Sequence, residues 1–206
     1  MAVHAHVSPQ GAAPIEREAA HAALADAVAQ AEKEGAAAAM AIVDVDWCGR
    51  INRDRGRAAG DALLKALAKQ LKTAAGSGGT AFRYGGDAFC VVWRGVEKEQ
   101  AFLRVEQVRA ALESDQVTVS AGVAGYPDDG AAATDLVNKA FEALYRAKVS
   151  GRNKVCLARE EKMVTKTSHY TQGQVLGLRR LAEREGIKDA ELLREALNDL
   201  LRKYNA

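Results

Sequence analysis

The hydrophobic and polar positions of the chain switch between helical and strand-like spacing from residue 15 onward. Residues 15–34 form an alanine-rich helical stretch that Gly35 can terminate. Residues 39–46, AMAIVDVD, form a compact apolar run that ends in acids, which predicts a buried strand. Leucines at helical spacing predict a further helix over 59–73.

Two short apolar runs, TAFRY and FCVVW, flank the sequence Gly85-Gly86-Asp87-Ala88, which is typical of a β-hairpin. Beyond it the pattern predicts a helix at about 97–113, a strand at 117–124, a helix at about 131–149 and a last strand in NKVCLA. This order indicates an α/β (α+β) sandwich, in which helices flank a central mixed or partly antiparallel sheet.

The last part of the chain follows a different pattern. After a charged stretch, the polar strand candidate VTKTSHY precedes two helices, and the second helix begins after Asp189. The apolar positions of the two helices are Val175, Leu178, Leu181 and Ala182, and then Leu192, Leu193, Ala196, Leu197, Leu200, Leu201 and Tyr204. A module of about 40 residues cannot bury so wide a stripe alone, so we expect a homodimer.

Composition narrows the class of protein. The 206 residues are 48% hydrophobic and 27% charged, with no apolar run long enough to span a bilayer and no N-terminal signal-peptide pattern. The three cysteines lack metal-ligand spacing, so reduced thiols in a cytoplasmic protein without membrane contact are expected. Residues 164–206 hold 8 Lys/Arg against 6 Asp/Glu, which accounts for the whole net charge of +2 and points weakly to nucleic acid.

A few polar residues are candidates for phosphate chemistry. Asp44 and Asp46 end an apolar strand, and Asp87 sits at the tip of the Gly-Gly hairpin. Carboxylates from adjacent strand ends commonly hold Mg²⁺ against a triphosphate. Lys148 and Arg152, four residues apart, can supply cations for the phosphates. Taken singly, each residue is better explained as a turn acid or as a cation at a solvated helix end.

Four segments in order carry a resemblance to a known family. Residues 44–61, DVDWCGRINRDRGRAAGD, resemble a segment of the GGDEF family of diguanylate cyclases, and RYGGDAF resembles its signature hairpin. VTVSAGVAGYPDDG and EALYRAKVSGRN match its later blocks. The resemblance implies a palm-like fold in which two GTP-loaded protomers face each other and make cyclic di-GMP.

The resemblance also implies roles for individual residues, in three sets. It implies Mg²⁺ ligands at Asp44, Asp87 and the Val45 carbonyl, guanine contacts at Asn52 and Asp61, and phosphate contacts at Lys148, Arg152, Gly85 and Gly86.

The departures from the family pattern bear on activity. Ala88 stands where the family has a catalytic Glu, and Arg53 and Arg57 stand where Asp and His are usual. The feedback motif Arg-x-x-Asp is missing before the hairpin. Losing a group that assists proton transfer commonly costs about two to four powers of ten in rate. No catalytic residue is therefore intact, and we expect a domain that binds nucleotide but turns it over poorly.

The C-terminal segment resembles a ribbon-helix-helix DNA-binding domain, on HYTQGQVLGLRRLAEREGIKDAELLREALNDLLRKY. In that fold, strands of two protomers pair and enter the major groove. If Tyr170 points inward in such a fold, Thr165, Thr167 and His169 point to DNA, and Lys166 can reach phosphate. This register turns Lys166 and Ser168 toward the core, so a register shifted by one residue is the alternative. The alternative is a helical hairpin that only dimerises.

We therefore expect a flexible N-terminus over 1–14, a degenerate GGDEF domain over 15–157, a linker over 158–163 and a DNA-binding module over 164–206. The favoured function is a regulator that binds GTP or cyclic di-GMP and DNA. One alternative is an active diguanylate cyclase whose tail serves dimerisation. Another is a protein with neither activity, whose tail pairs the chain or recruits a partner.

Overall fold

The computed structural model describes residues 15–113, 117–159, 166–185, 188–190, 192–193, 196–197 and 200. The chain divides into two compact units, Met1–Glu160 and Glu161–Ala206. The first contains a single sheet between layers of helices, and the second is helical.

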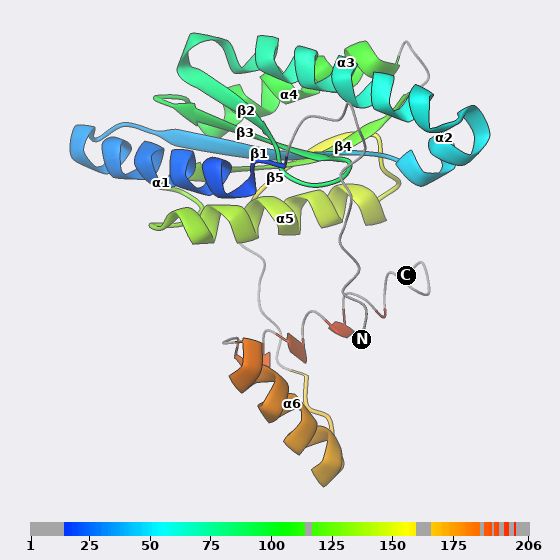
Figure 1. Cartoon of the computed structure of the whole chain (residues 1–206). Coiled ribbons are helices and arrows are strands. Elements are labelled where there is room, and N and C mark those ends of the chain that lie inside the picture. Colours follow the sequence, from blue (N-terminus) through cyan, green and yellow to red (C-terminus); the bar gives the residue numbers. More distant parts are fainter. Residues whose placement is uncertain are drawn as a thin grey trace. The chain divides into compact units, whose positions relative to one another are not determined.

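The sheet of the first unit has five strands in the order β2-β3-β1-β4-β5 (Figure 1). They are β1 (Ala38–Val45), β2 (Gly79–Arg83), β3 (Ala88–Arg94), β4 (Val119–Tyr126) and β5 (Lys154–Leu157). β1 runs antiparallel to both of its neighbours, β3 and β4, and β2 runs antiparallel to β3. β4 and β5 run parallel to each other. The predicted mixed sheet and the predicted hairpin are confirmed.

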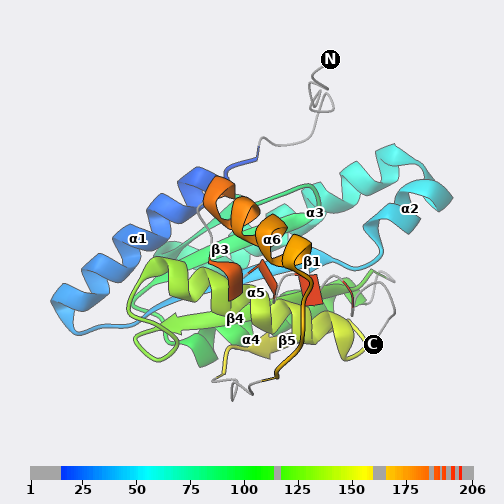
Figure 2. The same ribbon diagram turned by 90° about the horizontal axis from the view of Figure 1, so that it is seen from below.

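Helices cover both faces of this sheet (Figures 1 and 2). α1 (Arg17–Glu34) and α5 (Ala133–Val149) lie on one face, and α3 (Arg57–Ala75) and α4 (Lys98–Glu113) lie on the other. A short α2 (Cys48–Arg55) precedes α3, and a 3₁₀ turn, η1 (Gly76–Gly78), follows it. The sequence did not predict α2, because its glycine, arginines and asparagine show no apolar period.

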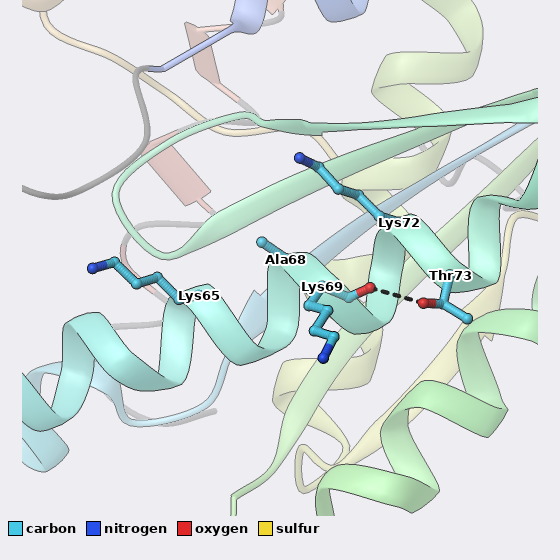
Figure 3. Close-up of a pocket in the computed structure, with 5 residues that line it drawn as sticks. All are labelled: Lys65, Ala68, Lys69, Lys72 and Thr73. Atoms are coloured by element: carbon cyan, nitrogen blue, oxygen red, sulfur yellow. Dashed lines mark hydrogen bonds between the residues drawn. The ribbon is translucent and has the colours of Figure 1, made fainter.

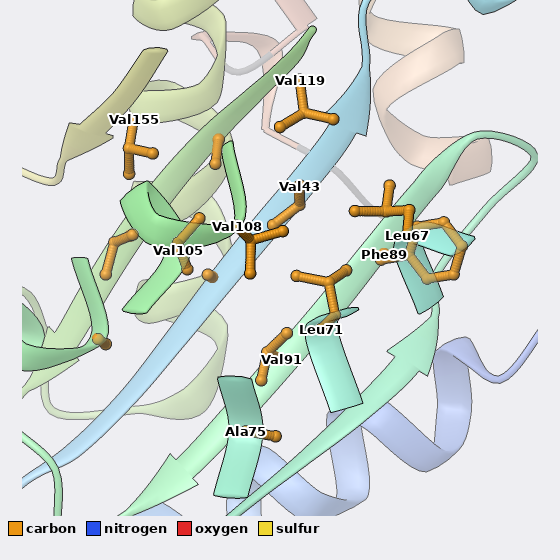
Figure 4. Close-up of a cluster of buried hydrophobic side chains, with 14 of the residues drawn as sticks. Val43, Leu67, Leu71, Ala75, Phe89, Val91, Val105, Val108, Val119 and Val155 are labelled. Carbon is orange, nitrogen blue, oxygen red and sulfur yellow. The ribbon is translucent and has the colours of Figure 1, made fainter. Parts of the chain in front are cut away.

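The central position of β1, covered by helices on both faces, explains why its apolar run is continuous rather than alternating. Ala39, Ala41, Val43 and Val45 belong to the core beneath α3 and α4, part of which Figure 4 shows. Ala38, Met40 and Ile42 belong to the core against α1 and α5. Successive side chains of a strand point to opposite faces, so a central strand covered on both sides must be apolar throughout.

Two glycines shape the layers. Gly35 ends α1 at φ 62°, with its N–H bonded to the Ala31 carbonyl, so the predicted helix stop is confirmed. Gly122 of β4 lies so close to α5 that a Cβ atom there would overlap the Ala140 carbonyl oxygen and the Leu144 nitrogen.

The second unit begins with Lys166–Thr171, which carry no regular secondary structure, and continues into α6 (Gln172–Glu185). Thr171 Oγ1 accepts from the N–H of Gln174, and the Gln174 amide oxygen accepts from the N–H of Thr171, which is a capping box. Residues 189–190, 192–193, 196–197 and 200 are helical.

The strand predicted in VTKTSHY is not present in the described residues 166–170 of the single chain. A strand needs a hydrogen-bonded neighbour, and one chain supplies none here. Across the described part of the chain, no helix has the length and apolar content needed to cross a bilayer.

Candidate functional site

The ends of β1 and β3 bring the predicted acids together. Asp44 is the direct antiparallel partner of Ala88, and the Val45 N–H donates to the Asp87 carbonyl oxygen at 3.2 Å. Directly opposed residues point to the same face of a sheet, with Cβ atoms about 4.5–5.5 Å apart. The Ala88 methyl group therefore adjoins Asp44 at a position from which a longer acid would extend its carboxylate.

Lys148, in the last turn of α5, places its Nζ 2.6 Å from Asp44 Oδ1. The Asp44 side chain is only 14% exposed. Burial raises the pKa of this carboxyl, the charges of Asp87 and Asp46 raise it further, and Lys148 opposes them. Lys148 of α5 and Asp44 of β1 therefore form a direct ion pair at the end of β1.

The hairpin between β2 and β3 is held by its own residues. The Arg83 guanidinium donates to the carbonyl oxygens of Gly85 at 3.2 Å and Gly86 at 2.6 Å. The Tyr84 and Gly85 N–H groups both donate to the Ala88 carbonyl oxygen. A Cβ atom built at Gly86 would have no heavy atom of the described residues within 4 Å, so this turn has room for a ligand.

Asp46 has a different role from Asp44. It lies just beyond β1 and is 3% exposed, and it accepts from Ser120 Oγ at 2.7 Å and from the Asn153 N–H at 3.0 Å. Asn153 is also bonded to Arg109 and Glu113 of α4. Asp46 therefore fixes the Gly151–Asn153 loop to the end of β1, a role that the sequence pattern did not reveal.

Arg152, in the same loop, lies over the ring of Trp47, with its guanidinium carbon 4.0 Å from the ring centroid. Both residues have left-handed backbone, at φ 63° and φ 58°. Trp47 is 59% exposed despite its size. The contact ties the Arg152 guanidinium to the segment that follows Asp46, and the sequence pattern had given Trp47 no role.

The predicted guanine contacts come from neighbouring helices. Asn52 is on α2 and Asp61 on α3, and a Cβ atom at Gly60 would overlap the Asn52 side-chain oxygen. Because Gly60 has no side chain, the Asn52 side chain can lie against α3. Burial raises the pKa of the Cys48 thiol, and the charges of Asp87, Asp44 and Asp61 raise it further, while that of Arg83 lowers it.

The acids fit a magnesium ion that arrives with a nucleotide. Mg²⁺ is usually held through one or two carboxylates, while phosphates and waters complete its coordination. Asp44 and Asp87, with the Val45 carbonyl, match that requirement. Within the described residues, no group of three or more His, Cys, Asp or Glu could hold a metal on its own.

Among the residues predicted to contact DNA, Lys166, Thr167 and His169 are exposed, and Thr165 lies outside the described residues. In the same unit Tyr170, Val175, Leu176, Leu197 and Leu200 are exposed, each by 38 to 54% of its surface. This unit therefore presents both a polar segment and unburied apolar side chains.

With this fold and site, the chain belongs to the GGDEF family: residues 15–154 match the family described as diguanylate cyclase, GGDEF domain. Residues 167–205 match the ribbon-helix-helix domain. Both predicted resemblances are confirmed.

Curated relatives agree with this assignment. Diguanylate cyclase A of Treponema denticola is 35% identical over 57% of this chain and 34% of its own length. Diguanylate cyclase DgcP of Pseudomonas aeruginosa is 31% identical over 66% of this chain and 21% of its own length. The chain thus spans about a third or less of the length of these relatives.

Solved structures share the fold. The active GGEEF domain of a diguanylate cyclase from Vibrio cholerae has a TM-score of 0.67 and 27% identity, covering 71% of this chain and 99% of that chain. The coiled coil and GGDEF domain of DgcB from Caulobacter crescentus, in complex with c-di-GMP, has a TM-score of 0.64 and 27% identity, covering 69% and 80%.

Proposed function

We propose that this chain is a nucleotide-responsive DNA-binding regulator, whose GGDEF domain binds a guanine nucleotide with Mg²⁺ but makes little cyclic di-GMP. The observation that carries the proposal is the pairing of Asp44 with Ala88. The chain also carries every residue expected to bind nucleotide, while the position opposite Asp44 offers only a methyl group.

In this proposal each part of the site binds one part of the nucleotide. Asn52 and Asp61 provide a donor and an acceptor for the guanine edge. Lys148 and Arg152 neutralise the phosphates as they pass Gly85 and Gly86. Asp44, Asp87 and the Val45 carbonyl would hold Mg²⁺, which would supply neutralisation of the phosphate charge.

The second unit supplies the output. Two copies bury the exposed apolar side chains of Val175, Leu176, Leu197 and Leu200 against each other. The segment before Tyr170 then gains a partner for its backbone groups and becomes a ribbon in the major groove. Thr165, Thr167 and His169 would face base edges, and Lys166 would reach phosphate.

A second candidate function is an active diguanylate cyclase, favoured by the likeness to the active Vibrio cholerae domain. Incubating the purified chain with GTP and Mg²⁺ separates the two. Negligible cyclic di-GMP, together with GTP or cyclic di-GMP binding by calorimetry, supports the regulator. Sustained cyclic di-GMP production overturns it.

The DNA-binding part has its own test. In a selection from random duplexes, the chain should enrich a sequence, and a variant with both Thr167→Ala and His169→Ala should lose that preference while staying dimeric. Lys166→Ala should weaken all sequences alike and lower the salt slope by about one unit. If the parent binds no duplex at low salt, the tail is a dimerisation device.

A further inference from the structure

The segment that forms α2 and α3 carries a concentrated positive charge. Residues 48–73 contain seven Lys/Arg and two Asp/Glu, a net charge of +5. Residues 1–163 contain 21 Lys/Arg and 21 Asp/Glu. When residues 48–73 are left out, the rest of residues 1–163 holds 14 Lys/Arg against 19 Asp/Glu. The neutral total thus hides a strong separation of charge, which focuses the field on one surface.

These basic side chains face solvent. All seven are exposed: Arg50, Arg53, Arg55, Arg57, Lys65, Lys69 and Lys72. Arg50 pairs with Asp54 at 3.3 Å. For the other six, the described residues provide no acidic partner within ion-pair distance. Their charges are available to a ligand.

Three of the lysines form a row along α3. Lys65, Lys69 and Lys72 are four and three residues apart, which places them on one side of the helix, away from the buried Leu67 and Leu71. With Ala68 and Thr73 they line an open hollow of about 490 Å³, and Figure 3 shows their side chains leaving successive turns. The row spans about 10 Å at 1.5 Å per residue.

We propose that the lysine row of α3, formed by Lys65, Lys69 and Lys72, binds the phosphate backbone of duplex DNA without reading its sequence. Duplex DNA carries about six phosphates over a length of 10 Å, counted over both strands, so over that length it offers more phosphates than the row has lysines. The extended row and the exposure of its members favour a polyanion over a single phosphate, which would need an enclosed cradle.

This inference rests on the proposed DNA binding by residues 164–206. Because both surfaces belong to one chain, a duplex bound by the tail is confined to the neighbourhood of the first unit, which raises its effective concentration there. Contacts of this kind raise affinity and set position, and the base contacts of the tail carry the specificity. A dimer presents two such surfaces.

The test uses the full chain with Lys65, Lys69 and Lys72 all replaced by Gln, a residue of similar helix propensity. Binding to a random-sequence duplex is titrated between 50 and 200 mM salt. The slope of log K against log salt should fall by about 2.7 for each protomer engaged, and affinity near physiological salt should fall by about 10- to 100-fold. The preference for a selected sequence over a random one should not change.

Two matched variants serve as controls. Replacing the same three lysines by Arg should preserve the parental slope, because the charges remain. Replacing the exposed Lys33, Arg94 and Arg159 by Gln removes the same charge from other places on the first unit and should change the slope much less. Equal slopes for the lysine-to-Gln variant and this second control would overturn the inference.

The outcomes also separate the inference from the proposed function. If Thr167→Ala with His169→Ala abolishes sequence preference while the lysine variant binds like the parent, the function stands and the inference fails. If the Lys-to-Gln variant has a smaller slope of log K against log salt while the Thr167/His169 variant behaves like the parent, the inference stands. The proposed sequence recognition by the tail is then wrong. If phosphatidylserine vesicles bind the parent more tightly than DNA, and lose binding in the lysine variant, the surface recognises a membrane and the inference is wrong.

Discussion

Ala88 presents a methyl group at the point where β3 meets the end of β1. Its backbone is an ordinary member of the hairpin ladder, since its carbonyl oxygen accepts from Tyr84 and Gly85. The proposed loss of activity therefore concerns the side chain at this position and not the strand that carries it.

Ala88→Glu should restore a carboxylate beside Asp44 and raise cyclic di-GMP formation by at least about 100-fold, the lower range for a group that assists proton transfer. Product formation from GTP and Mg²⁺ is the measurement. Ala88→Gln has the same shape without the charge and should stay at background. An Ala88→Glu variant as inactive as Ala88→Gln would show that other departures from the family pattern limit turnover.

Asp44 is a residue whose ionisation is opposed by its burial in the fold. Because burial raises its pKa above the unfolded value, its ionisation costs stability once the pH exceeds the folded pKa. Asp44→Asn should therefore be more stable than the parent at pH 7, and the difference should vanish below the unfolded pKa of about 3.9. Urea unfolding at several pH values measures this, and a gain that grows as pH falls would contradict it.

Trp47 is the residue whose role became visible only through its neighbour. Its contact with Arg152 is of a kind worth about 0.5–1 kcal/mol at exposed sites. Trp47→Ala should therefore weaken GTP binding by about 2- to 5-fold in calorimetry, and Trp47→Phe should recover part of it. The free energy of unfolding should change little, because the ring is 59% exposed. Unchanged GTP affinity in Trp47→Ala would mean that Arg152 is positioned by its loop alone.

At the scale of elements, the approach of α5 to β4 places Lys148 over the end of β1. Gly122 permits this approach, because any side chain there would meet the backbone of α5. The same helix buries Leu136, Ala140 and Ala143. The position of Lys148 beside Asp44 is thus set by a glycine far from the site in sequence.

Gly122→Ala should destabilise the first unit by about 3 kcal/mol, at the upper end of the cost of forcing extra volume into a packed core. It should also weaken nucleotide binding through displacement of α5. Gly49→Ala is the matched control, since a Cβ atom at Gly49 on α2 meets nothing within 4 Å and its φ is not positive. That control should be stabilising by about 0.5–1 kcal/mol. Similar urea midpoints for the two variants would contradict the packing argument.

At the scale of the whole molecule, the two units differ in how completely their apolar side chains are buried. The first buries both faces of its sheet. In the second, Ala182 and Leu192 are buried, whereas Leu176, Leu197 and Leu200 are each more than half exposed. An isolated unit of this size cannot supply the missing cover, so a second copy is the natural partner.

The chain should therefore be a dimer through residues 164–206. Truncation after residue 160 should leave a folded monomer at micromolar concentration in analytical ultracentrifugation. In the full chain, Leu197→Glu together with Leu200→Glu should weaken dimerisation by more than 10-fold, because each places a charge on the apolar stripe. A truncated protein that remains dimeric would show that the first unit pairs the chains.

Much of the fold could be predicted from local pattern. The continuous apolar run of β1, the Gly-Gly turn between β2 and β3 and the stop at Gly35 each depend on residues close together in the chain. The exceptions are α2, which is too short and polar to show a period, and the segment before Tyr170. A strand there cannot form in one chain, because its hydrogen-bonding partner would be a second molecule.

The sequence by itself determined which residues stand at the ends of strands and which functional groups they carry, including the missing carboxylate at Ala88. Only the tertiary structure decided that Asp46 fixes a loop while Asp44 faces Lys148, because the partners of Asp46 lie 74 and 107 positions away along the chain. The same holds for Trp47 and Arg152. A local pattern reports the faces of its own helix or strand, but the environment of a side chain beyond a strand's end is set by the segments that fold against it.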